Sequence, residues 1–202
     1  MAVQGYLRFP TIAGDSIVFV AEDDLWRVSA SGGRAERLTA DVAEARNPRF
    51  SPDGRLIAFT GWAEGPGEVY VMASDGGDAR RLTFQGDTAS VVAWRPDGSA
   101  IIYASSAGEP SRRMVTLQQV APTGGPTTTL PYGPARSIAF GPGGALVLGR
   151  NTAEPAFWKR YRGGTAGYLY IDPTGSGDFH RLLKLNMTSM QNNALYLLPL
   201  PR

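Results

Sequence analysis

Residues 50–59 read Phe-Ser-Pro-Asp-Gly-Arg-Leu-Ile-Ala-Phe and combine a tight turn with an apolar run. Ser51 suits the first position of a β-turn, Pro52 presets φ at the second, and Asp53 is tolerated at the third. Gly54 supplies the positive φ with which a chain enters a hairpin. The stretch therefore predicts two antiparallel strands that are joined by a tight turn.

The same unit recurs twice further along the chain. Residues 94–98 read Trp-Arg-Pro-Asp-Gly and residues 140–144 read Phe-Gly-Pro-Gly-Gly, each before a short apolar run. The prolines of the three turns, at positions 52, 96 and 142, are 44 and 46 residues apart. A period of this length that is filled by strands is typical of the blade of a β-propeller.

We therefore expect an all-β protein with four blades of four strands each, at about residues 5–39, 47–83, 91–130 and 136–183. Residues 1–184 would form a partial β-propeller, and residues 185–202 form an atypical tail that does not continue the pattern. Apolar residues occur on both sides of the second strands, as Ile57 and Phe59 alternate with Leu56 and Ala58. Blades that stack face to face bury both faces, whereas a half-exposed sheet alternates apolar and polar residues.

The number of blades suggests an open ring. Four blades are the lower limit of known closures, and a partial ring leaves two blade faces without a neighbour. We expect these faces on the first blade, around residues 17–19, and on the fourth, around residues 146–148. Because exposed apolar patches mark interaction sites or aggregation, the chain alone should self-associate or need the rest of its parent protein.

Composition excludes several classes of function. The 202 residues include no cysteine, which excludes disulfides, thiolate metal sites and a cysteine nucleophile, and which fits a reducing compartment. The net charge is only +2, and no basic run interleaved with aromatic residues indicates nucleic-acid binding. We expect no secretory signal at the N-terminus, and no apolar run approaches the roughly 20 residues that span a bilayer.

Catalytic chemistry has little support in the sequence. A hydrolytic triad needs a base, and His180, the only histidine, falls on the predicted outermost strand of the fourth blade. One histidine without cysteines does not assemble a typical zinc site, and no phosphate-binding Gly-Lys-Ser/Thr pattern occurs. We therefore expect no catalytic residue, no metal and no cofactor in this chain.

Two acidic segments each allow two interpretations. Residues 22–24, Glu-Asp-Asp, form either a cation or peptide-amine site at the propeller rim or a hairpin turn with solvated charges, and we favour the turn. Residues 172–178 faintly resemble a calcium loop, but they lack the ligand at the third position and the closing glutamate. A turn is therefore the expected structure there too.

One basic cluster is our candidate for peptide binding. Lys159, Arg160, Tyr161 and Arg162 lie in an insert that is longer than its counterparts in the other blades. Arginine grips carboxylates with two parallel hydrogen bonds, so the cluster suits peptide carboxylates or a partner protein. The alternative is that Tyr161 and Trp158 pack on the blade while the cations stay solvated.

Three stretches carry a resemblance to a known family. The Ser-Pro-Asp-Gly, Asp-Gly-Gly and Arg-Leu-Thr motifs are generic to TolB-like propellers with WD40-type (PD40) repeats. Residues 6–12, 22–26 and 158–167 are more specific, and they resemble the amino-terminal propeller of the tricorn protease family. The resemblance covers about residues 5–184.

The resemblance implies a six-bladed propeller, followed in the family by a seven-bladed propeller, a PDZ domain and a core with a serine nucleophile. It implies a cytoplasmic homo-oligomeric hydrolase that trims peptides, with propellers that channel substrates and products. This chain matches none of the catalytic core, so it would be a non-catalytic segment that forms a channel or docking wall for peptides. The alternative is a TolB-like module that binds a protein partner and has no link to proteolysis.

Overall fold

The computed structural model describes residues 6–40, 43–150 and 167–182. Strands β1 to β16 form four antiparallel sheets, and in each sheet four strands follow one another in chain order. The first sheet holds β1 (Arg8–Ala13), β2 (Ser16–Ala21), β3 (Asp24–Ser29) and β4 (Glu36–Arg37). The second holds β5 (Ala45–Phe50), β6 (Leu56–Gly61), β7 (Glu68–Ala73) and β8 (Arg80–Arg81).

The third sheet holds β9 (Ser90–Trp94), β10 (Ile101–Ser105), β11 (Thr116–Val120) and β12 (Thr128–Pro134). The fourth holds β13 (Ser137–Phe140), β14 (Leu146–Arg150), β15 (Tyr168–Asp172) and β16 (His180–Arg181). A single 3₁₀ turn, η1 (Pro142–Gly144), joins β13 to β14. The four four-stranded blades that the sequence predicts are therefore confirmed.

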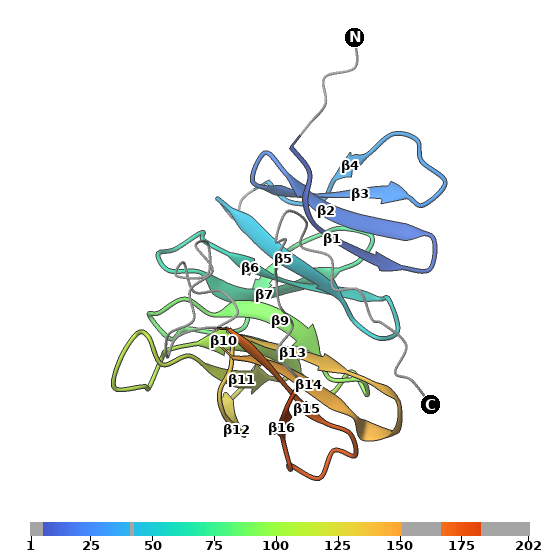
Figure 1. The fold of residues 1–202 in the computed structure, drawn as a ribbon. Helices are drawn as coiled ribbons and strands as arrows, with labels where there is room; N and C mark the ends of the chain where they lie inside the picture. Colours follow the sequence, from blue (N-terminus) through green and yellow to red (C-terminus); the bar gives the residue numbers. More distant parts are fainter. Residues whose placement is uncertain (1–5, 41–42, 151–166, 183–202) are drawn as a thin grey trace.

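The four blades stack in chain order, with the first at one end of the arrangement and the fourth at the other (Figure 1). The first strands of consecutive blades are in contact, β1 with β5, β5 with β9, and β9 with β13. Each blade then runs outward through its second and third strands to a short fourth strand. This is the arrangement of blades in a β-propeller.

The predicted turn at residues 51–54 is confirmed in detail. The amide of Gly54 donates a hydrogen bond to the carbonyl oxygen of Ser51 at 2.8 Å, and Gly54 has φ 72°. Asp53 fixes the turn, because its Oδ1 accepts hydrogen bonds from Ser51 Oγ at 2.6 Å and from the amide of Arg55 at 3.1 Å. Gly98 repeats the geometry, also with φ 72°. Positive φ therefore explains why glycine closes both turns.

Each blade has two faces, which we name by their neighbours. The leading face packs against the preceding blade and the trailing face packs against the following one. Three apolar clusters fill the spaces between consecutive blades. In the first cluster, Val18 and Val20 on the trailing face of the first blade meet Ile57 and Phe59 on the leading face of the second. In the next, Ala58 belongs to the trailing face of the second blade.

The end blades are buried on one face only. In β2, Val18 and Val20 have no exposed surface, whereas Ile17 and Phe19, which point to the leading face, are half-buried. In β14, Leu148 is fully buried, but Val147 on the trailing face is half-buried. Within the described residues, the two uncovered faces therefore lie where the open-ring prediction placed them.

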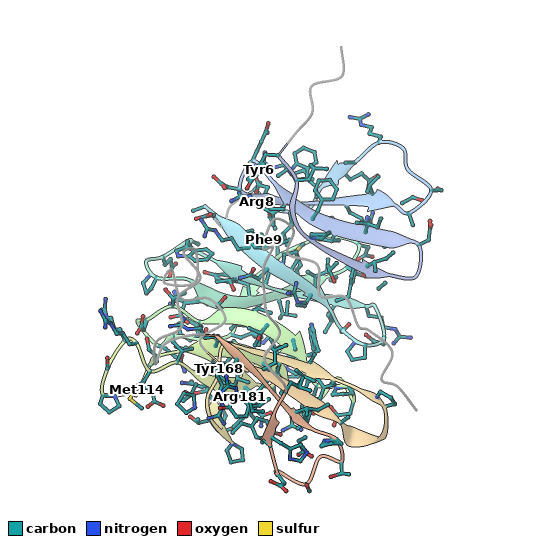
Figure 2. The ribbon with its side chains drawn as sticks, in the orientation of Figure 1. Tyr6, Arg8, Phe9, Met114, Tyr168 and Arg181 are labelled. Carbon is teal, nitrogen blue, oxygen red and sulfur yellow. The ribbon has the colours of Figure 1, made fainter. Side chains whose placement is uncertain are left out.

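The fourth strands of the first two blades end earlier than predicted, for a common reason. We expected the fourth strands of the first two blades to run to Thr39 and Thr83, but β4 and β8 end at Arg37 and Arg81. The threonine hydroxyl replaces the main-chain partner there, because Thr39 Oγ1 accepts the hydrogen bond from the amide of Leu25 at 2.9 Å. In the third blade, β11 begins at Thr116, and Met114 lies exposed in the connection before it (Figure 2).

Candidate functional site

One rim of the blades collects the connections between second and third strands. In an antiparallel meander, every second strand ends and every third strand begins at the same edge. The connections at residues 22–23, 62–67 and 106–115 therefore share one rim with the ends of β14 and β15. Our candidate peptide-binding residues, Lys159, Arg160, Tyr161 and Arg162, belong to the fourth connection by sequence; they lie outside the described residues and stay a prediction.

The second blade carries a buried carboxylate at this rim. Glu68, the first residue of β7, is 1% exposed. Its carboxylate accepts hydrogen bonds from Thr83 Oγ1, from Arg81 Nη2 at 3.2 Å and from the amide of Gln85 at 2.8 Å. The hydroxyl of Thr83 in turn accepts a hydrogen bond from the amide of Val69 at 2.9 Å. Burial of this charge is tolerated because both carboxylate oxygens are paired.

The first blade repeats the same network. Thr39 Oγ1 donates to Asp24 Oδ1 at 2.9 Å, and Arg37 Nη2 forms an ion pair with Asp24 Oδ2. Our expectation of solvated charges at residues 22–24 is therefore wrong for Asp24, which is buried because Arg37 and Thr39 replace water around it. It holds for Glu22 and Asp23, which are exposed and have φ 50° and 64°, as the two central residues of a tight hairpin turn require.

A sequence signal for this network existed, and we did not use it. In both blades an acidic residue starts the apolar third strand, and Arg-Leu-Thr follows 13 to 15 positions later. The first blade has Asp24 and residues 37–39, and the second has Glu68 and residues 81–83. We treated the Arg-Leu-Thr motif as a generic strand end. Its pairing with the preceding acid identifies a polar clamp between the third and fourth strands.

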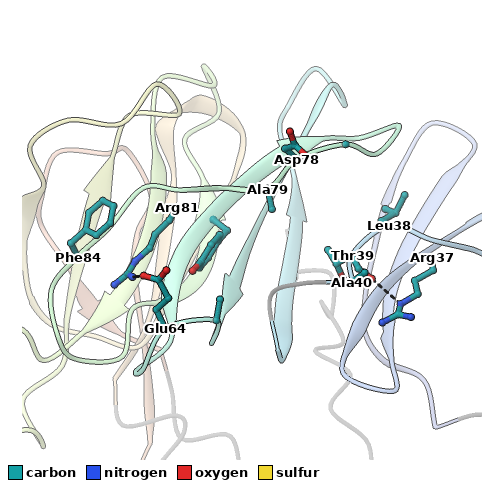
Figure 3. A pocket seen from close by; sticks show the side chains of 12 residues that line it. Arg37, Leu38, Thr39, Ala40, Glu64, Asp78, Ala79, Arg81 and Phe84 are labelled. Carbon is teal, nitrogen blue, oxygen red and sulfur yellow. Dashed lines mark hydrogen bonds and ion pairs between the residues drawn. The ribbon is translucent and has the colours of Figure 1, made fainter.

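A groove of about 680 Å³ lies between the outer parts of the first two blades. Figure 3 shows Glu64, Arg81 and Phe84 on one wall and Arg37 and Thr39 on the other. Arg81 is the centre of the first wall, because it pairs with Glu64 at 2.9 Å as well as with Glu68. Its guanidinium carbon lies 4.5 Å from the centroid of the Phe84 ring, a cation–π contact.

The two residues of this wall that face solvent are Glu64 and Phe84. The Glu64 side chain is 76% exposed and Phe84 is 74% exposed, whereas the Arg81 side chain is 17% exposed. Arg81 also donates from Nε to the carbonyl oxygen of Thr83 at 2.9 Å, so all three of its nitrogens are engaged. The groove therefore offers a carboxylate for an amine and a ring for an apolar side chain.

Two tyrosines behind this rim have a raised pKa. Desolvation raises the pKa of Tyr70, which lines the groove. Desolvation also raises the pKa of Tyr103 to about 12, although hydrogen bonds from its neighbours oppose the shift. Gln85 Nε2 donates to Tyr103 Oη at 2.9 Å and to Gln118 Oε1 at 2.6 Å. The amide of Gln85 also donates to Glu68 of the second blade, so the network links the second and third blades.

The other sequence candidates are placed as expected. His180 is exposed on β16, the outermost strand of the fourth blade. Asp172 is fully buried and closes a turn, since its carboxylate accepts hydrogen bonds from the amides of residues 174–177. Burial alone would raise the pKa of Asp172, but these four backbone donors lower it overall.

Within residues 6–40, 43–150 and 167–182, no group of three or more acidic, histidine or cysteine side chains is placed to hold a metal ion. Over the same residues, no helix has the length and apolar character that a membrane crossing requires.

The four antiparallel blades define the class of protein as a β-propeller. TolB from Acinetobacter baumannii has the same fold, with a TM-score of 0.63 and 22% identity over 85% of this chain and 41% of that one. Residues 4–196 match the sequence profile of the Tricorn protease N-terminal beta propeller domain. The chain belongs to this family.

Three relatives in the family are much longer than this chain. Tricorn protease homolog 1 of Streptomyces coelicolor is 44% identical over 90% of this chain and 17% of its own length. Tricorn protease of Thermoplasma acidophilum is 35% identical over 92% of this chain and 18% of its own length. A crystal structure of the tricorn protease superposes with a TM-score of 0.77 and 32% identity, over 90% of this chain and 18% of that one. The chain thus spans less than a fifth of these relatives.

Proposed function

We propose that this chain is a non-catalytic propeller segment of a tricorn-like serine peptidase, and that its rim forms a channel or docking wall for peptides. The catalytic core would be supplied by other parts of a cytoplasmic, homo-oligomeric hydrolase. The observation that carries the proposal is the 44% identity to a tricorn protease homolog along 90% of the chain. Support for a TolB-like binding module unrelated to proteolysis is limited to the shared fold.

The chemistry of the rim suits peptide termini. The exposed carboxylate of Glu64 offers a partner to a peptide ammonium group, and the exposed ring of Phe84 offers one to an apolar side chain. Arg160 and Arg162, which belong to the fourth connection by sequence, would grip a peptide carboxylate in bidentate fashion. Lys159 and Tyr161 would add charge and stacking surface to the same contact.

Peptide binding is tested by fluorescence anisotropy with a labelled tetrapeptide that has a free C-terminal carboxylate. We expect the double variant Arg160→Ala/Arg162→Ala to weaken binding about tenfold, the size of one charge-assisted hydrogen bond. Amidation of the peptide should have a similar effect. The matched control is Arg34→Ala/Arg55→Ala, which removes two cations from the opposite rim and should leave binding unchanged.

Two results would contradict the proposal at different levels. Equal binding by all variants would reject the assignment of Arg160 and Arg162 but keep the docking function. No saturable binding by the unmodified chain would reject the docking function itself.

The non-catalytic part of the proposal needs its own test. We expect no turnover of fluorogenic tri- and tetrapeptides by the isolated chain, because its single histidine is exposed on an outer strand. Turnover that survives repurification would contradict this expectation, and comparison with His180→Ala would show whether His180 acts as its base.

A further inference from the structure

The groove between the first two blades carries a surplus of acid. Its charged lining residues are Arg37, Glu64, Asp78 and Arg81. Arg37 already pairs with the buried carboxylate of Asp24. Arg81 already pairs with the buried carboxylate of Glu68, at 3.2 Å from Nη2 to Oε1. Two arginines therefore stand against four carboxylates, a net charge of −2, and the surplus acids are Glu64 and Asp78.

The two surplus carboxylates are open to solvent. The Glu64 side chain is 76% exposed, and Arg81 keeps its bond to Glu68 when Glu64 turns toward a ligand. Asp78 is exposed just before β8, and among the residues that the structure describes its carboxylate has no hydrogen bond or ion pair. Figure 3 shows Asp78 apart from Glu64. Two separate cationic groups therefore suit the groove better than one small cation does.

Apolar side chains line the same groove. Leu38 and Ala79 pack on the apolar core between the first two blades and keep part of their surface exposed. The ring of Phe84 is 74% exposed, and its contact with the Arg81 guanidinium, 4.5 Å from the ring centroid, holds it in place. Such a surface accepts aliphatic side chains and the stems of lysine or arginine. The volume of about 680 Å³ is large enough for several side chains.

We infer that this groove binds an extended peptide segment that carries two basic side chains with apolar residues between them. The basic groups would pair with Glu64 and Asp78, and the apolar residues would lie on Phe84 and Leu38. Both walls come from consecutive blades of this chain, so the groove does not depend on what precedes or follows the four blades. The inference rests on the proposed function, since it names the class of peptide that the docking wall takes.

Fluorescence anisotropy with a capped peptide tests the inference. The probe is the peptide Gly-Lys-Leu-Leu-Lys-Gly, whose N-terminus carries the fluorophore and whose C-terminus is amidated, so that neither terminal charge takes part. The matched probe has glutamine in place of both lysines. We expect saturable binding of the lysine peptide and about tenfold weaker binding of the glutamine peptide, because two ion pairs are lost.

Variants of the groove assign the contact. Glu64→Gln/Asp78→Asn should weaken binding of the lysine peptide about tenfold and reduce its dependence on salt, because fewer charges are left to screen. Phe84→Ala should weaken binding of both peptides about threefold and leave the salt dependence unchanged, because only an apolar contact is lost. The matched control Glu22→Gln/Asp178→Asn neutralises two exposed acids outside the groove and should bind like the unmodified chain.

Three results would overturn the inference. The first is equal binding of the lysine and glutamine peptides, and the second is equal binding by Glu64→Gln/Asp78→Asn and its control. The third is no saturable binding of the lysine peptide. In that case, binding of the tetrapeptide with a free carboxylate would keep the docking function and reject the groove alone, whereas loss of both would reject both. Equal strand content in circular dichroism separates a lost contact from misfolding.

Discussion

The middle blades and the end blades are built from the same four-strand unit, but they are buried differently. In β6 of the second blade, Ile57, Ala58 and Phe59 have no exposed surface on either face. In β2 of the first blade, Phe19 occupies the position that corresponds to Phe59, yet it is half-buried. The same residue in the same unit therefore contributes differently to stability, because a neighbouring blade covers one and not the other.

The polar clamps show the same contrast. Glu68 in the second blade and Asp24 in the first each pair with an arginine and a threonine from the fourth-strand segment. The Arg81 side chain of the middle blade is 17% exposed, whereas the Arg37 side chain of the end blade is 49% exposed. Water can thus replace part of the clamp in the end blade but not in the middle one.

The largest expected difference comes from truncating the two equivalent phenylalanines. Phe59→Ala removes a fully buried ring from the core between the first two blades and should cost about 3–5 kcal/mol in the free energy of unfolding. Phe19→Ala removes a half-exposed ring and should cost about 1 kcal/mol. Urea unfolding of both variants in monomeric protein measures the difference. Equal costs would mean that the end blade is covered as fully as the middle one.

The next contrast compares the two buried acids. Glu68→Ala removes the acceptor of Arg81 Nη2, of Thr83 Oγ1 and of the Gln85 amide in a buried site, and we expect a loss of about 3–5 kcal/mol. Asp24→Ala should cost about 1–2 kcal/mol, because water reaches Arg37 and solvates it. The measurement is again denaturant unfolding. A larger loss for Asp24→Ala than for Glu68→Ala would contradict the interpretation that the exposure of a clamp sets its contribution to the free energy of unfolding.

Glycine substitutions should show no such contrast, since backbone strain is local. Gly54→Val and Gly98→Val place a β-branched residue at φ 72° and should each cost about 1–3 kcal/mol. Gly14→Val in the end blade, at φ 55°, should cost a similar amount. The added Cβ at Gly54 would lie 3.4 Å from Ala13 Cβ, so steric contact adds little to this strain. Unchanged melting temperatures in all three variants would reject the turn assignment.

The smallest effect at neutral pH concerns Tyr103 in the third blade. Its pKa is raised by burial to about 12, above the value of about 10 for an exposed tyrosine. The stability that this shift contributes is fully present below pH 10 and is lost as the pH rises through 12. We expect Tyr103→Phe to flatten this alkaline loss of stability. If the free energy of unfolding falls equally above pH 10 in the unmodified chain and in Tyr103→Phe, the raised pKa of Tyr103 is not the cause of the loss.

Much of the fold was predictable because turn chemistry repeats in the sequence. Gly54 and Gly98 close turns that need positive φ, and their spacing defines the blades. The fourth strands were less predictable, because the hydroxyls of Thr39 and Thr83 replace main-chain hydrogen bonds and end the ladders early. A side chain that substitutes for the backbone leaves no mark in a pattern of apolar residues.

The candidate site was harder to predict than the fold. The sequence predicted a binding cluster at residues 159–162, whereas the groove depends on Glu64, Arg81 and Phe84. The pairing of β7 with β8, and the connection before β7, bring these three residues together. A groove between two blades is formed by segments that are far apart in the chain, so its existence follows from packing rather than from a motif.

Native-state hydrogen exchange, resolved strand by strand in monomeric protein, tests the central claim of an open arc of four blades most directly. The account predicts the strongest protection in β6 and β10, which are covered on both sides, with weaker protection in β2 and β14 at the ends. Equal protection of all four second strands in the monomer would contradict the open arc and would indicate that the blades close on themselves.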